Sequence, residues 1–168
     1  MDIKSRHFIK ASDVKKLVAD LKERFGDSID PLLGSKPRVE RLVLENGEEL
    51  FAINNTVSFW KREDQYVPLL KLLIDKVVEL KAVAVDMGAV KFVTNGADVF
   101  RQGIRSIDPL IRAGDIVAVV DEKNHRPLAV TQALYDAEQM EGLGSGKALK
   151  NLHTINDFLW ELSKEIMK

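Results

Sequence analysis

The sequence contains no cysteine and no long apolar run, and its charges almost cancel. Without cysteine there are neither disulfide bonds nor thiolate metal sites, so we expect a cytoplasmic protein. No run of about 18 apolar residues occurs, which predicts no membrane-spanning helix, and the segment MDIKSRHFIK lacks the apolar core of a secretory signal. The net charge is −1, from 25 basic and 26 acidic residues. Binding to nucleic acid would therefore need a local patch rather than bulk positive charge.

Residue constellations typical of enzymes are also missing. The three histidines, His7, His125 and His153, lie far apart in the sequence. No H-E-x-x-H motif, no G-x-S-x-G motif and no cluster of carboxylates occurs. We therefore predict no metal site, no cofactor and no catalytic residues, and we interpret His153 as a structural histidine near the closing strand.

The stretch GLGSGKAL, from Gly142 to Leu149, has the look of a phosphate-binding loop. A Walker A loop has four residues between its first glycine and the Gly-Lys pair, and a serine or threonine then binds Mg²⁺. Here three residues separate Gly142 from Gly146, and Ala148 stands where the hydroxyl residue would be. The sequence thus argues against a nucleotide-hydrolysing enzyme.

Residues 1–80 predict a small α+β domain that begins with a strand over 5–10 and a helix. Ser12 is the expected N-cap of that helix, Asp13 suits its first turn, and Gly26 ends it. Its apolar residues recur at helical spacing: Val14, Leu17, Val18, Leu21 and Phe25. A loop is expected over 31–37, where two prolines flank Gly34.

A β-hairpin and a second helix complete this predicted domain. Asn46-Gly47 lies between two runs rich in β-branched and large apolar residues, which is the strongest short signal for a hairpin. A further strand is expected over 56–60. Pro68 is expected to begin a helix with a broad apolar side that reaches Leu80.

Residues 81–168 have a different pattern, and we expect a second domain there. Apolar runs at 81–86, 114–122 and 126–135 predict short strands, and glycines punctuate the intervening segments. Short strands with frequent glycine turns indicate a small β-barrel or sandwich. The segment 152–167 predicts a closing amphipathic helix that begins near Asn156 or Asp157.

The stretch VDMGAVKFVTNGADVFRQGI, at 85–104, resembles the signature of PUA domains, which are RNA-binding modules. The pattern is a strand that ends in aspartate, then a Gly-Ala pair, Lys-Phe-Val, a second Gly-Ala pair and a Gly-Ile turn. In this sequence the matching residues are Asp86, Gly88, Ala89, Lys91, Phe92, Val93, Gly96, Ala97, Val99, Gly103 and Ile104. The resemblance implies that the second domain is a PUA β-barrel.

The order of a small α+β domain, the segment YVPLLKLL and a PUA domain is similar to the malignant T-cell amplified sequence family of translation proteins, in its archaeal form. The resemblance covers essentially the whole chain, and it is close over the PUA half and loose over residues 1–65. Two residues depart from the pattern. Gln102 stands where many relatives have proline, which leaves the Gly-Ile turn more mobile, and Phe158 stands where relatives often have glycine.

The resemblance implies an RNA-binding surface made from the helix after the first PUA strand, the turn that follows and part of the last strand. Glycines let phosphate or ribose approach the backbone, turn amides can bind phosphate, and arginine can pair with phosphate or stack on a base. We call the residues at these positions the predicted RNA-binding set: Lys91, Asn95, Gly96, Arg101, Gln102, Gly103, Ile104, Arg105 and Lys147.

Several members of this set, and the two apolar residues that follow Lys91, also have a structural interpretation. Phe92 and Val93 are expected in the core rather than on the surface. The two glycines of the set can serve turn geometry alone. Arg101 and Arg105 alternate along a presumed strand, so they are expected on one face, either against RNA or in solvent. Lys147 either reaches an RNA phosphate or belongs to a flexible glycine connection.

The function that these observations imply is a non-enzymatic RNA-binding protein in translation. By the resemblance, the expected partners are the small ribosomal subunit and rRNA or tRNA, and an SUI-type translation factor is a further candidate. A ribosome-assembly or RNA-modification adaptor is one alternative. A protein-interaction module without RNA binding is another, and an RNA-modifying enzyme would need catalytic residues that the sequence does not reveal.

Overall fold

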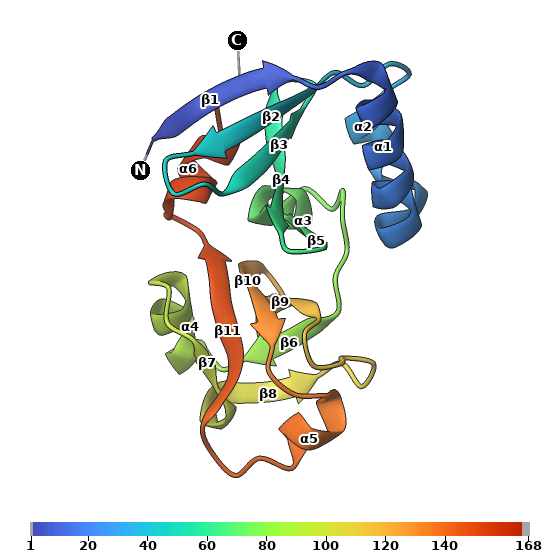
Figure 1. Ribbon diagram of the computed structural model, residues 1–168. Coiled ribbons are helices and arrows are strands. Elements are labelled where there is room, and N and C mark those ends of the chain that lie inside the picture. The colour runs from blue at the N-terminus through green and yellow to red at the C-terminus, as the bar shows by residue number, and fades with distance from the viewer. Residues whose placement is uncertain (1, 166–168) are drawn as a thin grey trace. The chain divides into compact units, whose positions relative to one another are not determined.

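The computed structural model describes residues 2–165, which form two compact units (Figure 1). The first unit extends to Glu79 and also takes in the segment that begins at Glu161, and the second runs from Leu80 to Trp160. Each unit is built on one β-sheet of its own, and helices and strands are mixed in both, as expected for an α+β protein. No helix among residues 2–165 combines the length and apolar character needed to cross a membrane.

The first unit has a five-stranded antiparallel sheet whose spatial order equals its sequence order. Its strands are β1 (Ile3–Phe8), β2 (Val39–Leu44), β3 (Glu49–Ile53), β4 (Thr56–Arg62) and β5 (Gln65–Pro68). The hairpin predicted at Asn46-Gly47 is confirmed, because it joins β2 to β3 and Gly47 has a φ of 86°. Glycine adopts this left-handed conformation without steric cost, which explains its position in the turn.

Helix α1 (Ala11–Phe25) packs its apolar side onto this sheet. Leu17 and Leu21 are buried, and the ring of Phe25 stacks on Phe59 of β4 with 5.5 Å between ring centroids. The predicted end at Gly26 is confirmed. The predicted N-cap at Ser12 is wrong: the helix begins after Lys10, whose extended backbone carbonyl accepts the first amide bonds.

Two prolines of the first unit, Pro31 and Pro68, lie elsewhere than predicted. The expected loop over 31–37 is helical at its start, because Pro31 lies in the first turn of α2 (Asp30–Leu33), which follows η1 (Gly26–Ile29). Residues 34–37 form neither helix nor strand, as predicted. Pro68 does not begin a helix but ends β5, an edge strand, where its missing amide breaks no ladder. The helix that follows, α3 (Leu70–Ile74), is short, because Lys76 turns to a φ of 59°.

The second unit has a barrel-like six-stranded sheet in the order β7-β11-β10-β9-β6-β8. The pair β6–β9 is parallel and the other pairs are antiparallel. The strands predicted over 81–86, 114–122 and 126–135 are confirmed as β6, β9 and β10. The bounds are β6 (Ala82–Val85), β7 (Val99–Phe100), β8 (Ile104–Ile107), β9 (Ile116–Asp121), β10 (Pro127–Ala133) and β11 (Lys147–Thr154).

A core of aliphatic side chains fills this sheet, with Val83, Val119 and Leu149 among its fully buried members. The helices of this unit are α4 (Met87–Thr94), η2 (Arg101–Gly103) and α5 (Ala137–Glu141). Helix α6 (Phe158–Ser163) begins at the end of this unit and continues into the segment from Glu161 that belongs to the first unit. The closing segment differs from the prediction, because residues 152–154 continue β11 and only 158–163 are helical. The predicted helical positions Ile166 and Met167 lie outside the described residues.

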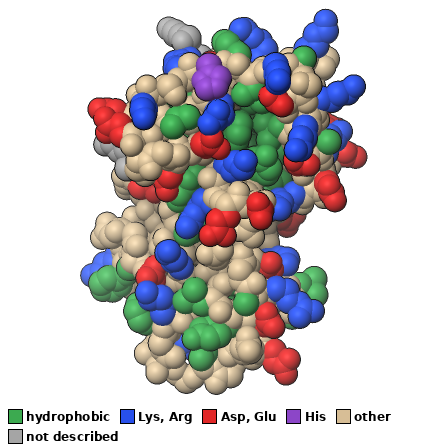
Figure 2. Space-filling view, viewed as in Figure 1, with side chains coloured by type: hydrophobic (Ala, Val, Ile, Leu, Met, Phe, Trp, Pro, Cys, Tyr) green, Lys and Arg blue, Asp and Glu red, His purple; other side chains and the backbone are tan. Residues whose placement is uncertain are grey.

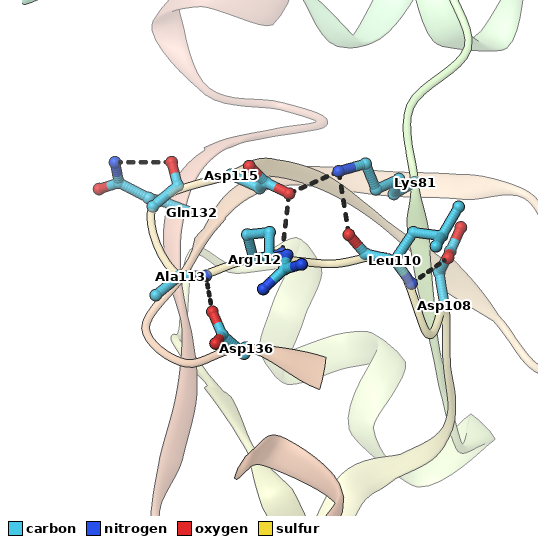
Figure 3. Close-up of polar contacts among 9 residues, drawn as sticks. Lys81, Asp108, Leu110, Arg112, Ala113, Asp115, Gln132 and Asp136 are labelled. Carbon is cyan, nitrogen blue, oxygen red and sulfur yellow. Dashed lines mark hydrogen bonds and ion pairs between the residues drawn. The ribbon is translucent and has the colours of Figure 1, made fainter. Parts of the chain in front are cut away.

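The loop between β8 and β9 is fixed by polar contacts on both sides (Figure 3). The Oδ2 atom of Asp115 accepts hydrogen bonds from Lys81 Nζ at 2.6 Å and from the Arg112 amide at 2.9 Å. The Asp136 carboxylate accepts from the Ala113 amide at 2.8 Å. These bonds tie the loop to Lys81 and to Asp136, while Leu110 within it is 71% exposed.

Candidate RNA-binding surface

Helix α4 carries the first part of the predicted RNA-binding set. Asp86 is its N-cap, and the Asp86 Oδ1 atom accepts a hydrogen bond of 2.8 Å from the Ala89 amide. Lys91 and Asn95 are exposed on the helix and at its end. Gly96 follows with a φ of 95°, a conformation that favours glycine and ends the helix. Turn geometry therefore accounts for Gly96, and no contact with RNA is needed to explain it.

The turn η2 and the glycine loop before β11 are fastened together. The Arg101 amide donates to the Gly146 carbonyl at 2.8 Å, and the Gly146 amide donates to the Gln102 side-chain oxygen at 3.3 Å. Lys147 pairs across from Phe100 where β11 meets β7. Tertiary structure thus brings residues 101–102 beside residues 146–147, more than forty positions away in the sequence.

Gly103 lies where η2 approaches α4 closely. A Cβ atom at this position would lie 3.2 Å from the Cβ of Ala89, which is closer than ordinary van der Waals contact. The next residue, Ile104, is buried in the core of the second unit. Core packing takes up the Ile104 side chain, so the predicted contact of Ile104 with RNA stays a prediction that only its backbone could fulfil.

The two arginines of the set do not share one strand. Arg101 belongs to η2, and its side chain is only 21% exposed because it donates to the Ile104 carbonyl at 3.2 Å and pairs with Glu141 at 3.4 Å. Arg105 lies on β8, is 59% exposed and pairs with Asp86 and Glu122, each at 3.4 Å. The expected common face fails because a 3₁₀ turn interrupts the strand between them.

Lys147 is also paired with a carboxylate of its own chain. Its Nζ atom lies 2.8 Å from Asp98 Oδ2, and the Asn151 amide donates to Asp98 Oδ1 at 2.8 Å. Partial burial by itself would raise the pKa of Asp98, but the hydrogen bonds from Lys147 and Asn151 outweigh it, so that the pKa is lowered. The Asp98 carboxylate is consequently ionised at neutral pH.

Two phenylalanines stand on the surface next to these residues. Phe92 is 58% exposed, so the expectation that it belongs to the core is wrong, whereas Val93 beside it is buried as expected. Phe100 is 50% exposed and was not among the predicted site residues. It follows the buried Val99 in β7, and the alternation of a strand turns it outward. The Lys91 ammonium lies 5.2 Å from the centroid of the Phe92 ring.

The surface view agrees with this local mixture of apolar and basic groups. At the edge of the second unit where α4 lies, hydrophobic side chains are next to Lys or Arg side chains (Figure 2). Elsewhere on the same face, acidic and basic side chains are interspersed over both units. The candidate surface is thus distinguished by exposed aromatic rings more than by its charge.

None of the three histidines belongs to the predicted RNA-binding set. His153 is buried in β11, and its Nδ1 atom lies 2.8 Å from Asp157 Oδ2, which is consistent with the structural role predicted for it. Burial by itself would raise the pKa of Asp157, but the bond with His153 contributes to lowering it. Among residues 2–165, no group of three or more potential ligand side chains could hold a metal ion.

Comparison with protein families divides the sequence into two matching parts. Residues 1–76 match the Pre-PUA-like domain, and residues 81–155 match the PUA domain. An uncharacterized protein of Methanocaldococcus jannaschii is 38% identical over 160 residues, which are 95% of this chain and 98% of that protein. Malignant T-cell-amplified sequence 1 of Rattus norvegicus is 30% identical and covers 92% of this chain and 88% of its own.

Further similarity extends to yeast and to solved archaeal structures. Translation machinery-associated protein 20 of Saccharomyces cerevisiae is 29% identical over 98% of this chain and 96% of its own. The crystal structure of a hypothetical protein from Pyrococcus horikoshii superposes with a TM-score of 0.79 at 35% identity, over 95% of this chain and 99% of that chain. A PUA domain protein from Thermoplasma acidophilum gives a TM-score of 0.72 at 27% identity, with 95% and 99% coverage.

Proposed function

Because this chain belongs to the family of malignant T-cell-amplified sequence proteins, with a Pre-PUA-like domain followed by a PUA domain, we propose that it binds RNA and acts in translation. The name of the yeast relative, translation machinery-associated protein 20, supports the link to translation. Similarity along almost the entire chain supports carrying this role over to both domains rather than to the PUA domain alone. The proposal includes no covalent chemistry. It also includes a cytoplasmic location, where translation takes place.

The observation that carries this proposal is the meeting of α4, η2 and the start of β11 on one exposed surface. Lys91, Gln102 and Lys147 are all exposed there, although they come from three separate elements. Exposed side chains from different elements can contact successive groups of a structured RNA. RNA is recognised largely through shape, unpaired bases and 2′-hydroxyl groups, so a chain of nearly neutral charge can still be selective.

In finer terms, we propose that the protein binds the small ribosomal subunit and that its PUA domain contacts tRNA. The first test is co-sedimentation of the full-length protein with separated small and large subunits over a series of salt concentrations. Pelleting with the small subunit would support the proposal. Preference for the large subunit would contradict it and favour the alternative of a ribosome-assembly adaptor, and absence of any pelleting would leave free tRNA as the remaining RNA target to test.

The surface itself is tested by removing two exposed lysines, Lys91→Ala with Lys147→Ala. Both side chains are exposed, so the double variant should remain folded and lose subunit affinity, most clearly at low salt. The matched control removes two exposed cations elsewhere in the PUA domain, Arg112→Ala with Lys123→Ala. Equal losses in both double variants would argue for unspecific charge attraction rather than for this surface.

We also propose, from the family resemblance, an SUI-type translation factor as a protein partner. Binding of the purified pair is measured by calorimetry in the absence of RNA. If the lysine double variant binds this factor as tightly as the original protein, the RNA surface and the protein surface are separate.

A further inference from the structure

A small apolar recess lies between α4 and β7 on the PUA domain, and the proposed RNA binding does not by itself explain it. The recess has a volume of about 270 Å³. Phe92 and Phe100 stand at it, and Ala89 and Gly103 belong to its wall. Both aromatic rings are at least half exposed to solvent, which forgoes the free energy of burial that a phenylalanine normally gains on folding. An exposed apolar recess with two rings is typical of a place where a ligand packs.

The charges around the recess are largely neutralised within the protein. Lys147 is bonded to Asp98 at 2.8 Å, and Arg101 is paired with Glu141 at 3.4 Å. A phosphate group that approached these cations would have to compete with carboxylates already in place. Phosphate contacts can therefore contribute less to affinity here than the number of basic residues suggests.

One wall of the recess carries an ionised acceptor, which restricts what can occupy it. The carboxylate of Asp98 is part of the lining, and its bonds to Lys147 and Asn151 lower its pKa. A carboxylate has about four acceptor positions, so capacity remains after these two bonds. A purely apolar side chain from a protein partner would offer no hydrogen-bond donor to the remaining acceptor positions of the Asp98 carboxylate. A nucleobase has apolar faces for the two rings and N–H groups at its edge for the carboxylate.

We propose that the recess between Phe92 and Phe100 takes one unpaired RNA base, and that stacking on these rings supplies most of the affinity of this surface. This inference rests on the proposed RNA binding and specifies its physical origin. Stacking of a base on an aromatic ring tolerates different sequences, because every base has a π-face. Lys91, which lies over the Phe92 ring at 5.2 Å, stands beside the recess where a flanking phosphate can reach it.

The test measures binding of a fluorescent single-stranded RNA of ten nucleotides to the full-length protein and to the variants Phe92→Ala and Phe100→Ala. Each variant should bind between about 5-fold and 150-fold more weakly, the range found for loss of one base–aromatic stack. The matched control is Phe8→Ala, which removes a ring that is 51% exposed in the first unit and should leave the affinity unchanged. Thermal unfolding of each variant checks that the fold is retained.

Two further measurements separate stacking from charge. An oligomer of the same length with abasic residues keeps every phosphate, and it should bind as weakly to the original protein as the intact RNA binds to Phe92→Ala. A plot of the logarithm of the association constant against the logarithm of the salt concentration should have a slope no steeper than about −1.4. This slope corresponds to two phosphate contacts on a single strand. Equal affinity for the abasic oligomer, or a slope near −2.8, would overturn the inference.

Failure of this inference can be told apart from failure of the proposed function. If the original protein binds small subunits or tRNA but not the single strand, RNA binding stands and the base recess is refuted. The same holds if both phenylalanine variants keep full affinity for the single strand, and the recess would then be open to an apolar side chain of a protein. If the original protein binds none of these RNAs, both proposals fail together.

Discussion

A Cβ atom added to Gly103 would lie 3.2 Å from the Cβ of Ala89, and neither atom belongs to a side chain that can swing away. We expect Gly103→Ala to push η2 away from α4 and to lower the free energy of unfolding by about 1–3 kcal/mol, as overpacking commonly does. Urea denaturation measures the change. Since Gly103 also lines the recess, the affinity for single-stranded RNA should fall in the same variant.

A control for this prediction is available in the glycine loop nearby. Gly144 has no atom within 4 Å of a Cβ built on it and has no left-handed φ. Gly144→Ala should therefore change stability by less than about 0.5 kcal/mol. Equal destabilisation by the two substitutions would show that close approach to Ala89 is not what Gly103 provides.

A single residue, Phe92, also shows why one prediction from the sequence was wrong. Phe92 and Val93 are adjacent apolar residues in a helix, and the pattern offered no reason to separate them. The structure buries Val93 and exposes Phe92, because successive positions of a helix point in directions about 100° apart and the sheet covers only one side of α4. Exposure of Phe100, by contrast, could be found from strand alternation after Val99.

At the scale of the element, the turn between β9 and β10 is organised by one carboxylate. Asp121 is buried and accepts hydrogen bonds from the amides of Asn124 at 2.6 Å, Arg126 at 3.0 Å and Lys123 at 3.0 Å. The bond from the Asn124 amide contributes most to lowering the pKa of Asp121 below its usual 3.8, even though burial opposes it. An ionised carboxylate is thus part of the native turn.

This turn gives a prediction for pH. Because the native pKa of Asp121 is lowered, its contribution to stability is complete above about pH 3.8 and is lost as the pH falls through the native pKa. Asp121→Asn should unfold at a lower denaturant concentration than the original protein at pH 7, since an amide supplies a single acceptor oxygen. The difference should shrink between pH 5 and pH 3. A difference that is constant over this range would contradict the assigned role of the charge.

The hairpin from β3 to β4 has a two-residue turn in which both asparagines are left-handed, with φ of 50° at Asn54 and 71° at Asn55. Asn54 does more than turn the chain, because its side chain bonds the Arg38 amide and the carbonyls of Leu32 and Leu33 at 2.9–3.0 Å. We expect Asn54→Gly to cost about 1.5–3 kcal/mol of unfolding free energy through these lost bonds.

The neighbouring residue supplies the control for the turn. Asn55→Gly keeps the left-handed conformation and breaks no side-chain hydrogen bond between Asn55 and any other residue of positions 2–165. Its unfolding free energy should stay within about 0.5 kcal/mol of the original value. Thermal or urea unfolding of the two variants side by side decides between a role of conformation alone and a role of the Asn54 amide.

The local sequence pattern predicted some helices and strands correctly and others not. The Asn46-Gly47 hairpin and the strands β6, β9 and β10 are confirmed, because turn chemistry and β-rich runs act locally. The helix expected after Pro68 is confined to Leu70–Ile74. There, pairing of β5 with β4 takes Pro68 into a strand, and such pairing depends on residues distant in the sequence.

At the scale of the whole molecule, the last described segment of the chain belongs to the first unit and not to the PUA domain that precedes it. The segment from Glu161 is grouped with residues of the first eighty positions, and Leu162 within it is buried. We expect Leu162→Ala to destabilise the protein by about 2–5 kcal/mol, the usual cost of removing a buried leucine. Hydrogen exchange should then quicken in the amides of β3 and β4 of the first unit, although these strands are about a hundred residues away.

The exposed residue beside it in α6 serves as the comparison. Glu161 is exposed and makes a surface ion pair with Lys164 at 3.1 Å. Glu161→Ala should change the unfolding free energy by less than about 1 kcal/mol. If Leu162→Ala speeds exchange in β9 and β10 but leaves the first unit unchanged, the grouping of the closing segment with the first unit is contradicted.

Local patterns along the chain were sufficient to predict the α+β class, most strands of both units, the positions of the glycine turns and the PUA family. These features depend on local alternation, on turn residues with a left-handed backbone and on an ordered run of signature residues. Which basic residues are available for binding depends instead on how the chain folds. Lys147 meets Asp98, Arg101 meets Glu141 and Arg105 meets Asp86 only after the barrel-like sheet has formed, since each pair joins separate elements. Electrostatic pairing depends on distance in space, and spacing along the chain does not reveal it.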